Sequence, residues 1–303
     1  MIIRISDVLC RLVLGALMVV VPVLMTTLVT APVAMAGVLE RLAEDGVLRA
    51  GTRADAAPFA MRGADGAFSG LSVDLLEAIR AATEAKLGRS ITLEISPVTP
   101  ADRLERVASG GLDIVCGITT PTRQREDQVD FSLPFFRDGT RILVYRDALA
   151  SGPSLAVMTI AVAQSTTTEA VIAEALPGAT IRRFPDMRAA MEALAAGTVD
   201  GVANLGVVLL GLLREREPER SVVLLPRTRS LNTEPMACVL PENDSAWRDM
   251  VNGVLVDLFA GIGEFRGDYV ALYERWFGRA GLMHYPLNRE TRDYLSAIRP
   301  WAN

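Results

Sequence analysis

Leu112-Asp113-Ile114-Val115-Cys116-Gly117 is a short, mostly apolar run that follows the helix-breaking pair Gly110-Gly111. A run of this kind is typical of a β-strand that is buried on both faces of a parallel sheet. Upstream, the pattern of apolar residues predicts a helix over 100–109, a strand over 91–95, a helix over 73–87 and a strand over 47–52. This alternation predicts an α/β fold with a mostly parallel, doubly wound sheet, on which ligands bind at the carboxyl ends of strands.

A second, smaller unit with the same alternation follows. We expect its strands over 159–163, 180–184 and 199–203 and its helices over 167–176 and 187–196. Strands over 141–146 and 236–241 bracket this unit, and two such crossings suit a hinge. We therefore predict an α/β fold of two lobes with two hinge-crossing strands. Residues 37–141 and 241–303 would form lobe 1, and residues 142–240 would form lobe 2.

The N-terminus has the features of an export signal. Arg4 and Arg11 precede an almost uncharged apolar stretch over 12–33, and Ala34-Met35-Ala36 follows it. This small-x-small pattern predicts a signal peptide over 1–36 and a periplasmic mature protein. The apolar stretch is also long enough to span a bilayer, so the sequence leaves a retained anchor open.

Composition excludes several classes of function. The chain has 31 basic and 36 acidic residues, and this balance gives no electrostatic reason to expect nucleic acid. Because His284 is the single histidine, a zinc site or a Ser-His-Asp site is not expected, and no metal or other cofactor is required. Cys116 and Cys238 follow the expected signal; they either pair in an oxidising compartment or remain small buried side chains.

Hydroxyl and guanidinium groups follow two of the predicted strands. One loop runs from Gly117 to Arg125 and contains three threonines, and the other is Gln164-Ser165-Thr166-Thr167-Thr168. Backbone amides at a helix start and arginine side chains both suit a bound carboxylate. The alternative is that the hydroxyls only cap the helices that follow.

The order of several short motifs resembles the solute-binding proteins of polar amino-acid ABC importers, known as solute-binding family 3. The motifs follow the family's order along the mature chain. They are G…PF over 51–59, G-x-x-x-D over 70–74, G-x-D-I over 111–114, a Q-G-T-T-x-E-like loop over 164–169, A-G-x-x-D over 196–200 and Y-x-x-W-F over 273–277. Within the family, Cys116-Gly117-Ile118-Thr119-Thr120, the segment 236–240 and the tail over 286–295 most resemble the glutamate/aspartate-binding branch.

This resemblance implies a monomeric binding protein that delivers a small anionic ligand to the membrane permease subunits of an ABC importer. It implies that Arg125 and Thr120 hold one carboxylate of the ligand, and that Arg53 and Arg103 reach a second one. It also implies a disulfide between Cys116 and Cys238. The full ligand-binding set implied by the resemblance is Arg53, Arg103, Ile118, Thr120, Arg125, Thr166, Thr167, Thr168 and Asn204.

The sequence departs from the family where relatives place an aspartate for the ligand's ammonium group. Here the chain has Ala203-Asn204-Leu205-Gly206, which offers no carboxylate. Met187 stands where acidic amino-acid binders have a histidine, and Ala56-Ala57 stands in place of an aromatic shelf. Since an unpaired buried ammonium is costly, two ligand classes stay open. They are an acidic amino acid and a small dicarboxylate, keto acid or hydroxy acid without an amino group.

Two other functional classes use the same fold. A dehydratase would need a carboxylic acid above its substrate, for which Asp55, Asp102 and Glu169 are the candidates. A sensory module would need a transmembrane segment and a cytoplasmic part downstream. We expect neither class, and therefore no catalytic residue.

Overall fold

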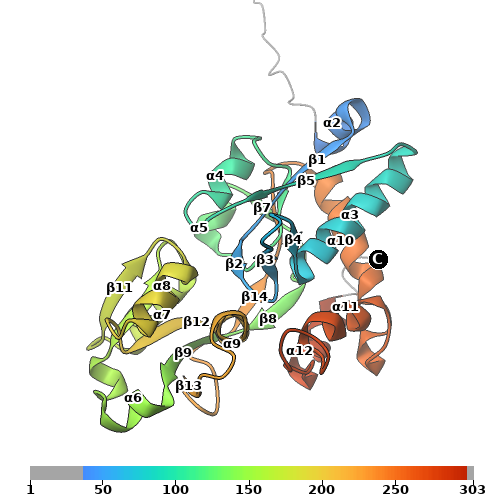
Figure 1. Cartoon of the computed structure of the whole chain (residues 1–303). Helices are drawn as coiled ribbons and strands as arrows, with labels where there is room; N and C mark the ends of the chain where they lie inside the picture. Colours follow the sequence, from blue (N-terminus) through green and yellow to red (C-terminus); the bar gives the residue numbers. More distant parts are fainter. Residues whose placement is uncertain (1–36, 299–303) are drawn as a thin grey trace, which may run out of the picture. The chain divides into compact units, whose positions relative to one another are not determined.

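The computed structural model describes residues 37–298, so the expected signal peptide lies outside the described residues. Within this range, no helix is both long and apolar enough to cross a membrane. The described chain contains two five-stranded sheets, one in each lobe (Figure 1). This arrangement confirms the predicted two-lobed α/β fold.

The first sheet has the strand order β5-β1-β6-β15-β7. β1 pairs in parallel with both β5 and β6, whereas β15 runs antiparallel to its neighbours. Helix α3 packs on β1 and β5 and also contacts helices α10 and α11. The bounds are β1 Val47–Thr52, β5 Thr92–Pro97, β6 Ile114–Val115, β7 Asp130–Phe131, β15 Val239–Leu240, α2 Val38–Asp45, α3 Leu71–Leu87, α4 Arg103–Ala108, α5 Arg123–Glu126, α10 Ser245–Leu258 and α11 Asp268–Phe277.

The second sheet has the strand order β11-β10-β12-β9-β13. Its first three strands are parallel, and β9 is antiparallel to both β12 and β13. Helices α7 and α8 pack against β10, β11 and β12, and α9 follows β12 directly. The bounds are β9 Thr140–Tyr145, β10 Thr159–Ala163, β11 Thr180–Phe184, β12 Gly201–Leu205, β13 Val222–Leu225, α6 Arg146–Ser151, α7 Thr167–Ala175, α8 Met187–Ala195 and α9 Gly206–Arg216.

The hinge differs from the prediction. The strands expected to cross between lobes, 141–146 and 236–241, are for the most part members of the two sheets, as β9 and β15. The segments that connect the sheets are instead the short antiparallel strands β8 (Phe136–Asp138) and β14 (Glu234–Met236). Three-residue strands are too short to give a periodic pattern, so the prediction placed both crossings in the longer strands beside them. The lobe boundaries at 141/142 and 240/241 remain a proposal.

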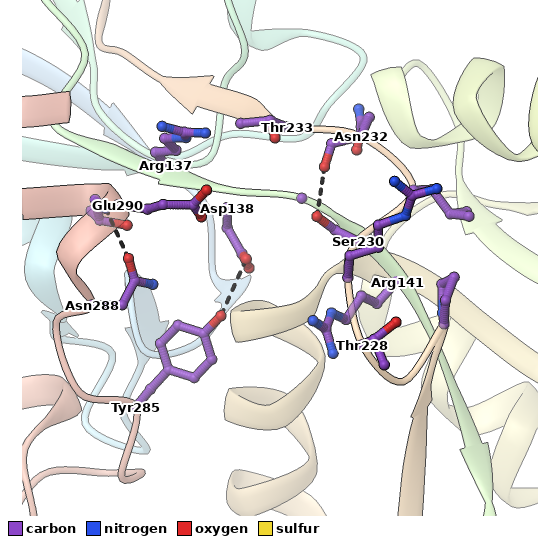
Figure 2. Close-up of a pocket in the computed structure, with 15 residues that line it drawn as sticks. Arg137, Asp138, Arg141, Thr228, Ser230, Asn232, Thr233, Tyr285, Asn288 and Glu290 are labelled. Carbon is purple, nitrogen blue, oxygen red and sulfur yellow. Dashed lines mark hydrogen bonds between the residues drawn. The ribbon is translucent and has the colours of Figure 1, made fainter. Parts of the chain in front are cut away.

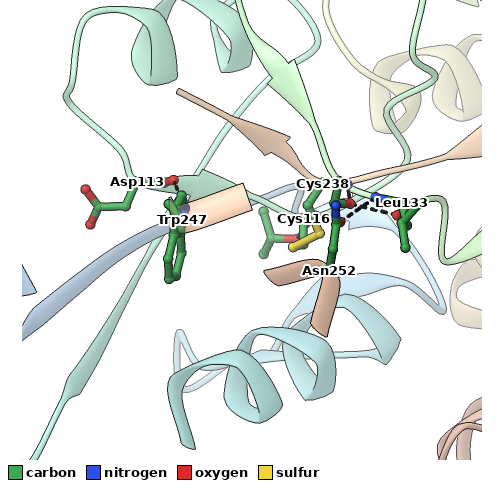
Figure 3. Close-up of a disulfide and its surroundings, with 8 residues drawn as sticks. Asp113, Cys116, Leu133, Cys238, Trp247 and Asn252 are labelled. Atoms are coloured by element: carbon green, nitrogen blue, oxygen red, sulfur yellow. Dashed lines mark hydrogen bonds between the residues drawn. A yellow bond between two sulfur atoms is a disulfide. The ribbon is translucent and has the colours of Figure 1, made fainter. Parts of the chain in front are cut away.

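A disulfide joins the residue that follows β6 to the segment before β15 (Figure 3). Cys116 and Cys238 are bonded and fully buried, which confirms the pairing that the family resemblance implied. The Cys238 amide donates to the Ser132 hydroxyl at 2.9 Å, and the Trp247 indole donates to the Asp113 carbonyl at 2.9 Å. The disulfide and these two hydrogen bonds therefore hold the ends of β6 and β15 in fixed positions.

Candidate functional site

The expected ligand-binding residues surround one cavity. All nine of them line it: Arg53, Arg103, Ile118, Thr120, Arg125, Thr166, Thr167, Thr168 and Asn204. Two further residues complete the wall, Leu205 and Glu234. The cavity measures only about 20 Å³, which is little more than the room for one water molecule. The lobes or side chains must therefore move apart before a larger ligand can enter.

The first lobe supplies three arginines from segments that follow its strands. Arg53 comes directly after β1, Arg103 begins α4, and Arg125 lies in α5. The Thr122 hydroxyl accepts a hydrogen bond from the Arg125 amide and so caps α5. The Arg125 guanidinium donates to the Thr120 carbonyl at 2.6 Å and to the Ser165 carbonyl of the second lobe at 3.4 Å. These bonds fix Arg125 at the boundary between the lobes.

The second lobe contributes the start of helix α7. β10 ends at Ala163, and the Thr166 hydroxyl donates to the Ala163 carbonyl at 2.7 Å. Because Thr166 is the N-cap and its side chain caps no amide, the first backbone N–H groups of α7 are available to a ligand. The N-terminus of a helix favours an anion through these amides and through its dipole.

Arg53 is already paired. Its guanidinium donates to both carboxylate oxygens of Asp55, at 2.7 and 2.6 Å, and Arg53 is only 2% exposed. Asp55 also accepts a hydrogen bond from the Met187 amide at the start of α8, in the other lobe, at 2.7 Å. Burial favours a higher pKa for Asp55, but the charge and hydrogen bonds of Arg53 and the Met187 amide hold that pKa below its usual value. The expected contact between Arg53 and a ligand carboxylate remains a prediction.

Arg103 is different, because it is buried without a hydrogen-bond or ion-pair partner for its Nε and Nη1 atoms in the described part of the chain. It is 2% exposed, and none of the ion pairs among residues 37–298 includes it. Within the same range, its Nε and Nη1 atoms have no hydrogen-bond partner. Burial and repulsion from Arg125 and Arg53 lower the pKa of Arg103 well below its ordinary value. Burial also lowers the pKa of Arg125, although the charge of Glu234 acts in the opposite direction.

Glu234 is the site residue that the sequence did not indicate. It begins β14, is 4% exposed and takes four hydrogen bonds. The hydroxyls of Thr120 and Thr167, one from each lobe, both donate to its Oε2 atom at 2.5 Å. The Thr140 hydroxyl and the Asn232 amide donate to Oε1 at 3.3 and 2.8 Å. The only signal in the sequence is an acidic residue next to Pro235, just before the expected strand at 236.

A second, larger cavity lies beside the hinge (Figure 2). It measures about 840 Å³ and is lined by polar residues of β8, β9, the segment 226–233 and the segment 285–291. The Tyr285 hydroxyl donates to Asp138 at 3.2 Å, and both residues line the cavity. None of the expected ligand-binding residues lines it. The smaller cavity is therefore the candidate site, because it holds the buried and unpartnered guanidinium of Arg103.

The chain also matches a known family. The model of the bacterial extracellular solute-binding proteins, family 3, matches residues 48–279. The chain belongs to this family. This family 3 protein is 26% identical to the L-glutamate/L-aspartate-binding protein of Pseudomonas aeruginosa, over 90% of this chain and 93% of that relative. It is 24% identical to the glutamate/aspartate import solute-binding protein of Salmonella typhimurium, over 79% of each chain. These relatives confirm the resemblance to the glutamate/aspartate-binding branch.

Solved structures with the same fold include binding proteins with other ligands. An ancestral amino-acid-binding protein, described as a precursor of cyclohexadienyl dehydratase, is 28% identical with a TM-score of 0.67, covering 80% of this chain and all of that one. An ancestral arginine-binding protein bound to arginine is 28% identical with a TM-score of 0.64, covering 77% of this family 3 protein and 99% of that chain. The family and these relatives make the protein a solute-binding protein of the amino-acid ABC transporter class.

Proposed function

We propose that the protein captures an acidic amino acid or a related small dicarboxylate in the periplasm and delivers it to the permease subunits of an ABC importer. It acts as a monomer that closes its two lobes around the ligand. The observation that carries this proposal is the buried guanidinium of Arg103, whose Nε and Nη1 have no partner among residues 37–298. A buried charge without a counter-ion is costly, so the site is suited to a ligand carboxylate.

The neighbouring groups support the same ligand class. Arg125 lies beside the cavity with its guanidinium already oriented by two carbonyls, so little side-chain entropy is lost when it binds a carboxylate. The first amides of α7 add further donors from the second lobe. Two relatives are named for glutamate and aspartate, which agrees with this class.

The geometry also supports closure as the mechanism. Contacts already join the two lobes around the cavity: Arg125 with the Ser165 carbonyl, and Asp55 with the Met187 amide. A ligand that fills the cavity would contact Arg103 and Arg125 in one lobe and Thr167 in the other. A ligand shifts the equilibrium between the open and closed conformations only through contacts that form preferentially in the closed one.

The three carboxylates considered for a dehydratase all have other partners. Asp55 pairs with Arg53, Glu169 pairs with Arg183 at 2.6 Å, and Asp102 accepts hydrogen bonds from the amide and the hydroxyl of Thr99. A carboxylate that is held by other protein groups is not positioned to transfer a proton to a bound ligand. This favours a binding protein over an enzyme.

Calorimetric titration of the mature chain tests the proposal. L-glutamate, L-aspartate, glutarate and succinate are each titrated, with L-arginine as the cationic comparison. We expect micromolar or tighter binding of at least one acid, no binding of L-arginine, and recovery of the acid unchanged after prolonged incubation. Binding of L-arginine alone, or conversion of the acid, would contradict the proposal.

A further inference from the structure

Glu234 is a buried carboxylate that forms no ion pair among residues 37–298, although the charge of Arg125 is near enough to interact with it. Asp55, the other carboxylate beside the cavity, is neutralised by Arg53 at 2.6 Å. None of the ion pairs formed among residues 37–298 includes Glu234, and its hydrogen-bond donors there are two hydroxyls at Oε2 and a hydroxyl and an amide at Oε1. Neutral donors offset only part of the cost of burying a charge. The site therefore has a place for a positive charge in direct contact with Glu234, which the described chain does not supply.

The position of Glu234 relative to Thr120 indicates where that charge belongs. Thr120 lies between Arg125, which donates to its carbonyl, and Glu234, which accepts from its hydroxyl. If a ligand carboxylate takes up the Arg125 guanidinium and the Thr120 hydroxyl, one lone pair on Oε2 of Glu234 becomes free. An amino group on the carbon next to that carboxylate would then face Glu234.

The charges at the cavity that form no ion pair among residues 37–298 are complementary to one class of ligand. Arg103 and Arg125 are two cations outside the ion pairs formed among residues 37–298, and Glu234 is one anion outside them. A ligand with two carboxylates and one ammonium group neutralises all three. A dicarboxylate without an amino group leaves Glu234 unpaired and adds two more negative charges near it.

We propose that Glu234 binds the ammonium group of the ligand and so selects an acidic amino acid over a dicarboxylate that lacks the amine. This inference depends on the proposed function above and identifies the ligand class of the same site. The negative charge of Glu234 attracts the ammonium group, whereas Arg103 and Arg125 bind the carboxylates.

Two matched ligand pairs and three variants test the inference. L-glutamate and glutarate differ only in the amino group, and so do L-aspartate and succinate. Glu234→Gln keeps the size and two acceptor lone pairs but removes the charge. Glu234→Asp keeps the charge. Glu217→Gln makes the same chemical change at a carboxylate outside the cavity, where Glu217 accepts a hydrogen bond from Tyr145.

We expect the parent protein to bind the amino acid of at least one pair about 30-fold or more tightly than its dicarboxylate. Glu234→Gln should reduce this preference to less than about threefold, mainly by weakening the binding of the amino acid. Glu234→Asp should still prefer the amino acid. Glu217→Gln should bind both ligands of the pair with the affinities of the parent. Dicarboxylate binding by Glu234→Gln at the parent's affinity shows that the variant is folded.

Two results would overturn the inference while leaving the proposed function intact. Either the parent binds glutarate or succinate as tightly as the matching amino acid, or Glu234→Gln keeps the parent's preference. If the parent binds none of the four acids, the proposed function fails and the inference fails with it. Circular dichroism and thermal unfolding of each variant establish that its structure matches the parent.

Discussion

Arg53 donates two nearly parallel hydrogen bonds to Asp55, and this buried pair also receives the Met187 amide from the opposite lobe. Arg53 lines the cavity, and Asp55 compensates its charge before any ligand arrives. Asp55 thus connects the guanidinium of one lobe to the start of a helix in the other. The consequences of removing its charge are predictable.

Asp55→Asn should destabilise the protein strongly. It leaves the Arg53 guanidinium buried without a counter-ion, and breaking a buried ion pair costs about 3–5 kcal/mol. Asp147→Asn is the matched control, because Asp147 pairs with Arg220 on the surface, where such pairs contribute about 0–1 kcal/mol. Denaturant unfolding measures both free energies. An Asp55→Asn variant as stable as the control would show that the Arg53–Asp55 pair is energetically unimportant.

The same pair predicts a pH dependence. Because the folded protein holds the pKa of Asp55 below its usual value, the stabilisation from this group is present above its unfolded pKa of about 3.9. It is lost as the pH falls through the lower pKa of the folded state. The difference in unfolding free energy between the parent and Asp55→Asn should therefore be constant above about pH 5 and should narrow below pH 4. A difference that stays unchanged down to pH 3 would contradict the assigned pKa shift.

Arg125→Ala should weaken ligand binding by about 100-fold. The variant loses a charge-assisted contact whose guanidinium is already oriented by the Thr120 carbonyl. Arg123→Ala is the control, because Arg123 lies in the same short helix but is exposed and does not line the cavity. Calorimetry on both variants distinguishes the loss of a direct contact with the ligand from the loss of one positive charge on this surface. Equal affinities in the two variants would place the ligand elsewhere.

Thr167→Ala should affect the closed state more than the first encounter. Its hydroxyl belongs to the second lobe and reaches Glu234, so its contacts form when the lobes meet. We expect the dissociation rate to rise about tenfold while the association rate changes little, since mutations at an interface act mainly on dissociation. Thr180→Ala, at an exposed position of β11, is the control for stopped-flow measurements. A slower association with unchanged dissociation would argue against this role in closure.

Replacing both cysteines with alanine should lower stability without changing ligand affinity. The disulfide closes a loop with a sequence separation of 122 residues, and on the chain-entropy account a loop of this size contributes about 4–5 kcal/mol. Neither cysteine lines the cavity. Unfolding of the double variant, compared with the parent under oxidising and reducing conditions, measures the contribution. A variant within about 1 kcal/mol of the oxidised parent would show that other contacts determine stability here.

The sequence predicted the elements with clear periodicity and the groups that gather at the site. Strands β1, β10 and β11 have the predicted bounds. The positions after the strands indicated two loops rich in hydroxyl and guanidinium groups, and only the family resemblance implied the full set of nine residues that line the cavity. β6 is shorter than its apolar run, covering only Ile114–Val115.

The pairing of charges could not be predicted. In the sequence, Asp55 is only one of three carboxylates considered for a dehydratase. Nothing local indicates that it meets both Arg53 and the Met187 amide, which lies 132 residues away in the sequence. Glu234 enters the site because β14 pairs with β8, so that a residue expected outside the strand contacts Thr120 and Thr167. Such contacts depend on tertiary structure rather than on local pattern.

The most direct test of the central claim is a crystal structure of the protein with an acidic ligand bound. We predict that carboxylate oxygens of the ligand lie within hydrogen-bond distance of the Arg103 and Arg125 guanidinium groups, so that Nε and Nη1 of Arg103 gain partners. A ligand bound elsewhere, such as in the larger cavity beside Tyr285, with Arg103 still unpartnered, would contradict the account.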